Sequence, residues 1–534
     1  MSSSYLAPTA VLAMAALTLT ACGGDISSST TTTAGVRAPT DAGRCTEDKA
    51  GGTITMGEYV MLPSFAPGQG QYGVRGGAQS AAVYDRLMRW DPETTAFEPK
   101  LAESLESSQD NTVWTLTLRD GVRFSNGDPL TADDVAFTVN LHQDPAIRST
   151  AQTDATNIER IRVLDPLTIE FTLTESWADF PAVLAGTVGE VIPEKAYLAT
   201  SPEEWARSPI GAGAFILDNY IPDQESTFKP NPEYYGGPVC PSLRFIRVPG
   251  SQGTYDAFQT GELEVAFIRG AKFVSAAKDD DAPGFEEIFS PGTILNMNTG
   301  VSGYDGVLTD ESARQAVSYA LDRDLLDQGV TGGLGFPAST LLDESPRFYD
   351  GQEGLSYDRD RATQLISEVK NDRPDWDGEL TLLVTDSPEN TETGVVAKAL
   401  LDAAGFNVTI ETVPISQVNA RQFTGDYEIV LGSMPTSDAD PASAFASAFV
   451  PGGAVNLTGI DDPELTKAVT EFKSAADLDG QKAAYTRLQD AFNKSVPFAV
   501  IARVPQYVTI DESAKGIVPT LSSTMLFDGA YLDE

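Results

Sequence analysis

The chain has very little of three things that much protein chemistry needs: cysteine, histidine and positive charge. In 534 residues it holds three cysteines and one histidine, and 36 lysines and arginines stand against 77 aspartates and glutamates. One histidine, His142, excludes the two-histidine zinc motifs and leaves no second histidine for a catalytic triad elsewhere. The formal net charge of −41 excludes nucleic acid as an expected partner, because an acidic surface repels phosphate backbones.

Recognisable catalytic and metal-binding motifs are missing as well. The sequence has no G-x-S-x-G, no P-loop, no C-x-x-C and no complete EF-hand loop. We therefore assign no catalytic residue, no metal ligand and no cofactor. Paired carboxylates could hydrolyse a glycan, but a chain with 77 acids contains many such pairs, so this signal has almost no specificity. His142 is predicted to be a surface residue near the end of a short helix.

The first 21 residues carry no charge, and their apolar run, residues 10–19, is too short to span about 30 Å of hydrocarbon as a helix. We interpret residues 1–21 as a signal peptide. The tetrapeptide that ends at Cys22 resembles the lipobox of bacterial lipoproteins, which implies lipidation of Cys22. The mature chain is then extracytoplasmic and held at the outer face of the cell membrane by the lipid alone. A Ser/Thr tract at 27–33 favours a flexible tether.

The two remaining cysteines, Cys45 and Cys240, are predicted to form a disulfide, because the signal peptide sends the chain to an oxidising compartment. Each cysteine comes just before an apparent strand, at 52–58 and 243–248. The bond would therefore join neighbouring strands of one lobe. Two unpaired buried thiols remain the alternative.

Residues 112–173 alternate between apolar and polar side chains. Trp114, Leu116 and Leu118 share one face, and a second alternating run covers 167–173, which is typical of half-buried antiparallel strands. Between these runs, residues 131–134 form a capping box that predicts a short helix through Val139.

The second half of the chain changes to alternating strands and helices. Strands are predicted at 380–385, 408–413 and 427–432, with helices at 394–404 and 417–423 between them. This order indicates an α/β lobe with a largely parallel sheet. Ligands of such sheets bind beyond the carboxyl ends of the strands, which makes the loops at 386–390 and 433–441 candidate binding segments.

Seven segments are similar, in order along the chain, to the extracellular solute-binding proteins of family 5, the dipeptide, oligopeptide and nickel receptors that serve ABC importers. They are residues 84–91, 98–104, 114–135, 209–215, 231–237, 258–264 and 313–323. The resemblance implies an α/β, two-lobed periplasmic-binding-protein-like fold, type II of the large oligopeptide-receptor class, with an inserted extra lobe. The implied divisions are 1–21 signal peptide, 22–50 lipidated Cys22 and tether, 51–75 lobe I, 76–205 lobe II, 206–295 lobe I, 296–503 lobe III (α/β) and 504–534 lobe I.

The resemblance also implies a set of ligand-binding residues. By position they are Tyr59, Met61, Leu62, Gly432, Ser433, Met434 and Arg503. An acidic residue that pairs with a peptide's α-amino group falls at Ser437 without a gap, and at Asp438 with a shift of one residue. Peptide receptors of this kind bind the ligand backbone as an added strand.

The implied function is that of the substrate-binding component of an ABC importer. The protein would capture a peptide or similar small solute in an interlobe cleft and deliver it to the permease and its ATPase subunits, without covalent chemistry. It is expected to be a monomer and not an enzyme. A sensory receptor that presents its ligand to a signalling protein is the first alternative, and a lipid-anchored hydrolase that uses two carboxylates is the second.

Overall fold

The computed structural model describes residues 44–69 and 76–533. The predicted signal peptide, Cys22 and the Ser/Thr tract lie outside the described residues. Within the described part of the chain, no helix has the length and apolar character that crossing a membrane requires.

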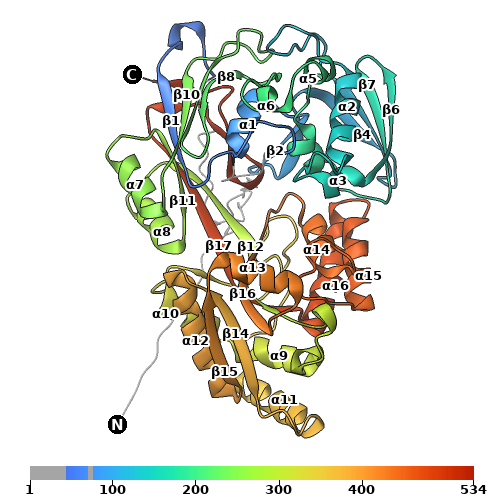
Figure 1. Ribbon diagram of the computed structural model, residues 1–534, viewed down its shortest axis with the longest axis vertical. Coiled ribbons are helices and arrows are strands. Elements are labelled where there is room, and N and C mark those ends of the chain that lie inside the picture. Colours follow the sequence, from blue (N-terminus) through green and yellow to red (C-terminus); the bar gives the residue numbers. More distant parts are fainter. Residues whose placement is uncertain (1–43, 70–75, 534) are drawn as a thin grey trace, which may run out of the picture. The chain divides into compact units, whose positions relative to one another are not determined.

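An 11-stranded mixed sheet runs through the described chain in the order β15-β14-β16-β12-β17-β11-β1-β10-β9-β8, and β13 pairs with β17 beside this path (Figure 1). Its strands are β1 Thr53–Glu58, β8 Phe215–Ile221, β9 Glu225–Pro230, β10 Ser242–Arg247, β11 Val265–Arg269, β12 Gly284–Met297, β13 Phe336–Pro337, β14 Glu379–Thr385, β15 Asn407–Val413, β16 Ile429–Thr436 and β17 Phe498–Ile510.

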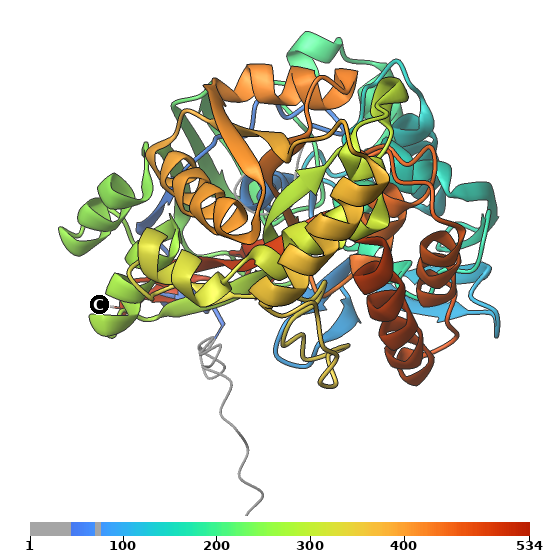
Figure 2. The same ribbon diagram turned by 90° about the horizontal axis from the view of Figure 1, so that it is seen from below.

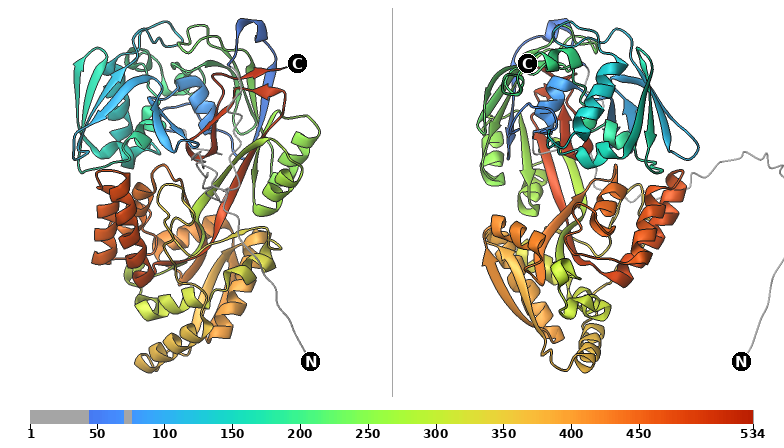
Figure 3. Two further views of the ribbon diagram at one scale, coloured as in Figure 1. Left: turned by 180° about the vertical axis from the view of Figure 1, so that it is seen from behind. Right: turned by 45° about the vertical axis from the view of Figure 1, so that its right-hand side comes forward.

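Two of these strands, β12 and β17, are much longer than the others, with 14 and 13 residues. They pair antiparallel from Gly284 opposite Thr509 to Asn296 opposite Phe498, with register shifts between Phe289 and Ile294. We call them the hinge strands. Figures 1 and 3 both show them side by side. In each hinge strand, one half packs in one hydrophobic core and the other half packs in a different core. The two paired strands therefore connect these two cores.

The first core gathers Ile54, Phe245, Phe285 and Val508 between β1, β10 and the outer halves of the hinge strands. Helix α1 (Gly77–Tyr84) packs in this core, although the sequence-based division placed residues 76–205 in lobe II. Further helices of this part are α5 Glu194–Leu198, α6 Pro202–Trp205, α7 Ser251–Gln259 and α8 Ala271–Asp279.

The structure joins Cys45 and Cys240 in a disulfide with 5.7 Å between their Cα atoms. The amide of Cys45 also donates to the carbonyl of Gly529 at 3.1 Å. Residues 44–50 are thus fixed to the C-terminal segment, although the expected tether extended to residue 50. That segment contains the short strands β18 Ala514–Lys515, β19 Val518–Thr520, β20 Thr524–Leu526 and β21 Tyr531–Leu532, and the 3-10 turn η5 Leu521–Ser523.

The second core surrounds a four-stranded antiparallel sheet in the order β4-β5-β7-β6, as the alternating side chains predicted. Its elements, with an adjoining β2–β3 hairpin, are β2 Met88–Asp91, β3 Ala96–Pro99, β4 Ala102–Ser107, β5 Val113–Leu118, β6 Ile158–Asp165, β7 Thr168–Leu173, α2 Ala132–Gln143, α3 Gln152–Thr156 and α4 Pro181–Leu184.

Helix α2 begins with the predicted capping box, in which the carboxylate of Asp134 accepts from the amide of Thr131 at 3.0 Å. The helix runs beyond Val139 to Gln143. His142 is 1% exposed and its Nδ1 lies 2.7 Å from the hydroxyl of Ser149, so the prediction that His142 is a surface residue is wrong. Burial lowers the pKa of His142 to about 4, so the ring is neutral at physiological pH.

The third core forms around the predicted α/β unit. Strand β14 pairs in parallel with both β15 and β16, as expected, but β16 pairs antiparallel with β12, so the sheet is mixed. Leu382 and Leu383 point to opposite faces and lie in different hydrophobic clusters, one with residues of α12 and one with Val418 of α13. Figure 2 shows α12 and α13 on the two faces of this sheet.

A fourth core, built from Phe445, Phe472, Tyr485 and Phe498, packs the last helices against the hinge strands. The helices of the third and fourth cores are α9 Glu311–Ala320, α10 Arg323–Val330, α11 Arg359–Asp372, α12 Pro388–Ala404, α13 Ile415–Thr424, α14 Pro441–Phe449, α15 Pro463–Lys473 and α16 Leu478–Ser495.

Candidate functional site

The carboxyl end of β16 meets the middle of the hinge strands, and several candidate residues come together there. Gly432, Ser433 and Met434 stand opposite Ile294, Thr293 and Gly292 of β12. These three residues lie in the strand, which continues to Thr436, so the expectation that a loop starts at Ser433 is wrong. The reason is the long-range pairing with β12, which extends β16 past the predicted end at residue 432.

One edge of β16 over this stretch is paired with no described strand, and we call it the free edge of β16. It pairs with β14 only at Ile429 and Val430, while its pairing with β12 continues to Thr436. From residue 431 onward, no described strand covers the side that faces away from β12. Unpaired main-chain groups at such an edge can bind another extended chain. Ser433 is exposed at this edge, and its hydroxyl donates to the carbonyl of Gly292 at 3.2 Å.

Arg503 lies on the neighbouring hinge strand, beside Ala502, which stands opposite Thr293. Its guanidinium pairs with Glu344 at 2.7 Å and lies 5.4 Å from the ring centre of Phe336. Only 11% of the side chain is exposed, and its Nε has no partner among the described residues. A cavity of about 90 Å³ lies beside Arg503 and Thr293. Arg503 therefore lies in β17, and β12 separates it from β16.

Residues Tyr59 to Leu62 follow β1 in the first core. Tyr59 is 43% exposed, and the guanidinium of Arg269 lies 5.2 Å from its ring centre. The side chains of Met61 and Leu62 are buried in the first core, at 2% and 0% exposure. A ligand could therefore meet the latter two only through their main chain.

The two alternative positions for an acidic ligand contact, Ser437 and Asp438, have different surroundings. One carboxylate oxygen of Asp438 accepts a hydrogen bond from Ser345, and its main-chain carbonyl accepts from Arg347 at 2.9 Å. Its second carboxylate oxygen is buried without a partner among the described residues. Burial raises the pKa of Asp438, and the hydrogen bond from Ser345 and the charge of Arg347 oppose this shift. The hydroxyl of Ser437 instead accepts a hydrogen bond from the amide of Ala439 at 3.3 Å, and it lowers the pKa of Glu287.

Glu287, in β12, is a site residue that the sequence analysis missed. Its carboxylate accepts a hydrogen bond from the hydroxyl of Ser523 at 2.7 Å. Burial raises its pKa to about 7, the hydroxyl groups of Ser523 and Ser437 lower it, and the charge of Asp438 raises it further. A usable signal was present: Glu286 and Glu287 form an acidic pair between apolar neighbours, and a strand must turn one of them to each face.

A second cluster joins the second core to the fourth. Arg347 pairs with Asp179 at 2.9 Å, and Asp179 also accepts from Gln481 at 2.7 Å. Lys473 pairs with Glu175 close by. We call these five residues the charged contact. The guanidinium of Arg347 also lies 5.4 Å from the ring centre of Trp90, and a cavity of about 320 Å³ opens beside this pair.

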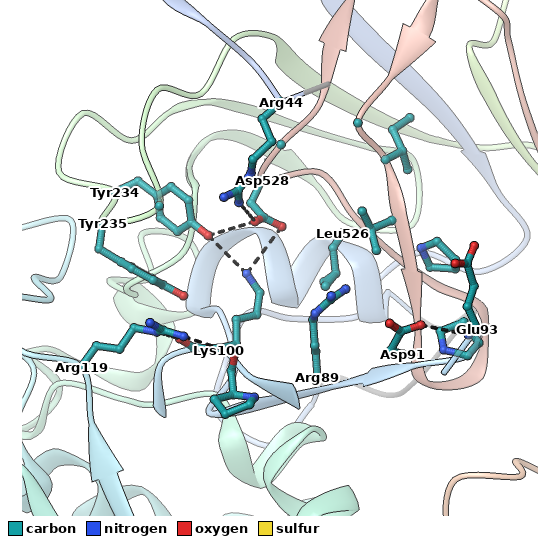
Figure 4. A pocket seen from close by; sticks show the side chains of 18 residues that line it. Arg44, Arg89, Asp91, Glu93, Lys100, Arg119, Tyr234, Tyr235, Leu526 and Asp528 are labelled. Atoms are coloured by element: carbon teal, nitrogen blue, oxygen red, sulfur yellow. Dashed lines mark hydrogen bonds and ion pairs between the residues drawn. The ribbon is translucent and has the colours of Figure 1, made fainter. Parts of the chain in front are cut away.

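A cavity of about 680 Å³ lies between the β2–β3 hairpin and the C-terminal segment, and none of the candidate ligand residues lines it (Figure 4). Its buried cation, Lys100, pairs with Asp85 at 2.9 Å and with Asp528 at 3.5 Å. Arg44 pairs with Asp528, and Arg119 donates to the carbonyl of Lys100. Because neighbouring groups already satisfy these cations, we interpret the cavity as structural. Nowhere in residues 44–69 and 76–533 do three or more metal-ligating side chains gather.

Two groups of cores are thus joined by the two long hinge strands, and several candidate ligand residues lie where β16 pairs with them. The sequence model of the bacterial extracellular solute-binding proteins, family 5 Middle, matches residues 96–456, more than half of the chain. The chain belongs to this family, whose members bind solutes outside the cell. The predicted family is thereby confirmed.

Individual relatives agree with this assignment. The chain is 24% identical to a putative ABC transporter peptide-binding protein of Brucella ovis, over 85% of this chain and 88% of that protein. It is 27% identical to the dipeptide-binding protein of Escherichia coli, over 70% of this chain and 74% of that protein. Among solved structures, DppA of Helicobacter pylori in complex with the peptide STSA is similar with a TM-score of 0.73 and 21% identity, over 91% of this chain and 99% of that one. The predicted periplasmic-binding-protein-like fold is confirmed.

Proposed function

We propose that this protein is the substrate-binding component of an ABC importer, and that its ligand is a peptide or a similar small solute. The single observation that carries the proposal is the free edge of β16 beside the hinge strands. An extended ligand can add to this edge as a strand, and main-chain hydrogen bonds would hold it without regard to its side chains. The two relatives, a putative peptide-binding protein and a dipeptide-binding protein, support this ligand class.

The hinge strands supply the mechanism of capture. We propose that lobe I corresponds to the first core with α1, lobe II to the second core, and lobe III to the third and fourth cores. The ligand would bind between lobes I and III, contact Tyr59 and Arg503 from the two sides, and stabilise the closed form. Because only a difference in affinity between open and closed forms can shift their populations, the ligand must touch both lobes. The closed form would dock on the permease and its ATPase subunits.

The remaining parts of the proposal concern location and chemistry. We propose a signal peptide over residues 1–21, lipidation at Cys22, and a monomer held outside the membrane by its lipid. The solute would leave chemically unchanged, since catalysis has no recognisable motif in the sequence. The sensory alternative shares every structural feature of this proposal.

Mass spectrometry of small molecules released from the denatured protein tests the proposed ligand class. We expect intact peptides or a related solute. Adding the recovered compound at 100 times its dissociation constant should stabilise the protein by about 2.7 kcal/mol in thermal unfolding. Cells that lack the gene should lose uptake of the labelled compound. Recovery of a cleaved product would contradict the proposal in favour of the hydrolase, and unchanged uptake with a lost signalling response would favour the sensory receptor.

A further inference from the structure

The charged contact is a place where the second core touches the fourth core. Asp179, in the loop after β7, pairs with Arg347 at 2.9 Å and accepts from the side-chain amide of Gln481 in α16 at 2.7 Å. Lys473, the last residue of α15, pairs with Glu175 of the same loop. Main-chain groups add to the contact, since the carbonyl oxygens of Lys473, Ser474 and Ala476 accept from Ala178, Ser176 and Asn111 at 3.4, 3.2 and 3.2 Å, respectively.

The second core is held to the first core on its other side. The amide of Trp90 in β2 donates to the hydroxyl of Thr520 in the C-terminal segment at 3.0 Å, and that hydroxyl donates back to the carbonyl of Trp90 at 2.8 Å. Lys100 pairs with Asp528 of the same segment at 3.5 Å. When the hinge strands bend, the first and second cores should therefore move together.

The fourth core packs against the hinge strands, through Ile294 of β12 and Phe498 of β17. Figures 1 and 3 show its helices α14, α15 and α16 beside the second core, to one side of the hinge strands. A bend of the hinge strands that opens the protein should consequently separate the second core from the fourth at the charged contact.

Arg347 connects the charged contact to the loop after β16. Its guanidinium donates to the main-chain carbonyls of Asp438 and Ala439, both at 2.9 Å, while it pairs with Asp179. Ala439 is fully buried and packs with Trp90 of the second core. The strand whose free edge we propose as the solute site thus continues directly into the contact.

The charges of this contact are buried where the two parts meet. The side chains of Asp179, Arg347 and Lys473 are 5%, 9% and 8% exposed. The attraction between buried charges is opposed by the loss of their hydration, whereas one charge left buried without its partner is strongly unfavourable. Such a contact can open reversibly, and it closes only when both partners are in place. Because all of its groups belong to the protein, it can form without a solute.

We propose that the second core is the latch of the closed form, and that the pairing of Asp179 with Arg347 fastens this latch. Because Arg347 also holds the loop after β16, the latch and a solute at the free edge of β16 stabilise the same closed arrangement. The inference deepens the proposed function by giving the second core a role, and it rests on that function only for the effect on a bound solute. Asp179 is a positioning residue, since it acts on the solute site through Arg347.

Small-angle X-ray scattering of the purified full-length protein without added solute tests the latch itself. Asp179→Asn keeps the shape of the side chain and removes its charge, so closing would bury Arg347 without its counter-charge. We expect this variant to have a larger radius of gyration than the wild-type protein. The matched control is Glu170→Gln in β7, which removes the acid of an ion pair with Arg162 inside the second core and should leave the radius unchanged.

The release rate of bound peptides tests the coupling between the latch and the solute site. A random tripeptide library is loaded on the immobilised protein, and the peptides that wash off are followed by mass spectrometry. Asp179→Asn should release them about tenfold faster than the wild-type protein or more, because opening frees the peptide and a weaker latch opens more often. Glu170→Gln should release them at the wild-type rate.

Hydrogen exchange of the wild-type protein needs no variant, so it decides the matter even if Asp179→Asn fails to fold. The amide of Ala178 donates across the contact, whereas the amides of the β12–β17 ladder lie within the hinge strands. Opening of the latch exposes the first and leaves the second bonded, so Ala178 should exchange faster than the ladder.

Any of four results would overturn the inference: a wild-type radius of gyration in Asp179→Asn, an equal expansion in Glu170→Gln, an unchanged release rate in Asp179→Asn, or exchange at Ala178 no faster than in the ladder. Failure of the proposed function gives a different pattern. The wild-type protein would then retain no tripeptide, while the scattering and exchange results would still support the latch.

Discussion

The hinge strands and the charged contact both join separately packed parts of the chain, but by different physical means. The hinge strands use a main-chain ladder that runs from Gly284 to Asn296. The charged contact uses side chains of Asp179, Arg347 and their neighbours. Each hinge strand is one unbroken stretch of chain, so the ladder between the two strands can bend while its hydrogen bonds stay formed. A side-chain contact between two parts of the protein must separate when those parts move apart. Opening should therefore flex the first region and disrupt the second.

The largest expected effect comes from a substitution inside the hinge strands. Gly292 has a φ of +74°, and an added Cβ would lie 2.3 Å from the carbonyl oxygen of Ala502 on β17. Because that atom belongs to the main chain of the partner strand, it cannot move aside cheaply. Gly292→Val should therefore yield little folded protein. The measurement is soluble yield and circular dichroism. Gly121→Val is the control, since that glycine also has positive φ but open space around it, and it should fold. Equal loss in both variants would mean that backbone strain alone is responsible.

The next effect concerns the charged contact. Asp179 and Arg347 are 5% and 9% exposed, so Arg347→Met leaves a buried carboxylate without its cation. The free energy of unfolding should fall by about 3–5 kcal/mol, as measured in urea. The double variant Arg347→Met/Asp179→Leu should recover most of this loss, because no unpaired charge remains. If the double variant is as unstable as the single one, shape and the cation contact with Trp90 matter more than charge.

A smaller, pH-dependent effect is expected at Asp440, which caps α14 by accepting from the amide of Ser443 at 3.2 Å. Burial and the charge of Asp179 raise its pKa to about 7, against about 4 in an unfolded chain. The native state therefore binds the extra proton between pH 4 and 7, and the contribution of this group to stability falls as pH rises through that range.

Asp440→Asn keeps a capping oxygen and removes the charge. The variant should exceed the wild-type protein in stability by roughly 1–3 kcal/mol at pH 8, and the difference should shrink towards zero near pH 4. Thermal unfolding at the two pH values checks this. A constant difference at both would mean that the carboxyl does not titrate in this window.

Local patterns in the sequence predicted a large part of the fold. Alternation over 112–173 predicted the antiparallel sheet, and the capping box at Thr131 predicted the start of α2. The errors arose where distant pairing decides the outcome. β16 reaches Thr436 because β12, more than a hundred residues earlier, pairs with it. His142 is buried because Ser149 and the turn after α2 fold over it.

The candidate site was predicted only in outline. The segment from Gly432 to Met434 and the strand near Arg503 do meet at the hinge strands. The partners of Ser437 and Asp438 could not be foreseen, because Glu287, Ser345 and Arg347 come from remote positions in the chain. A one-residue shift on a loop changes which way a side chain points, and only the three-dimensional structure fixes that direction.

The smallest expected effect isolates burial as the reason for the strength of the charged contact. Lys494 and Glu464 form an ion pair between α16 and α15 with a short separation of 2.6 Å, yet their side chains are 54% and 68% exposed. Water screens such a pair and competes for its hydrogen bonds, so Lys494→Ala should have the same urea midpoint as the wild-type protein. Arg347→Met, measured in parallel, should differ strongly from both. If Lys494→Ala destabilised the protein as much as Arg347→Met, burial would not explain the difference between exposed and buried pairs, and the charged contact would owe its stability to something other than the exclusion of water.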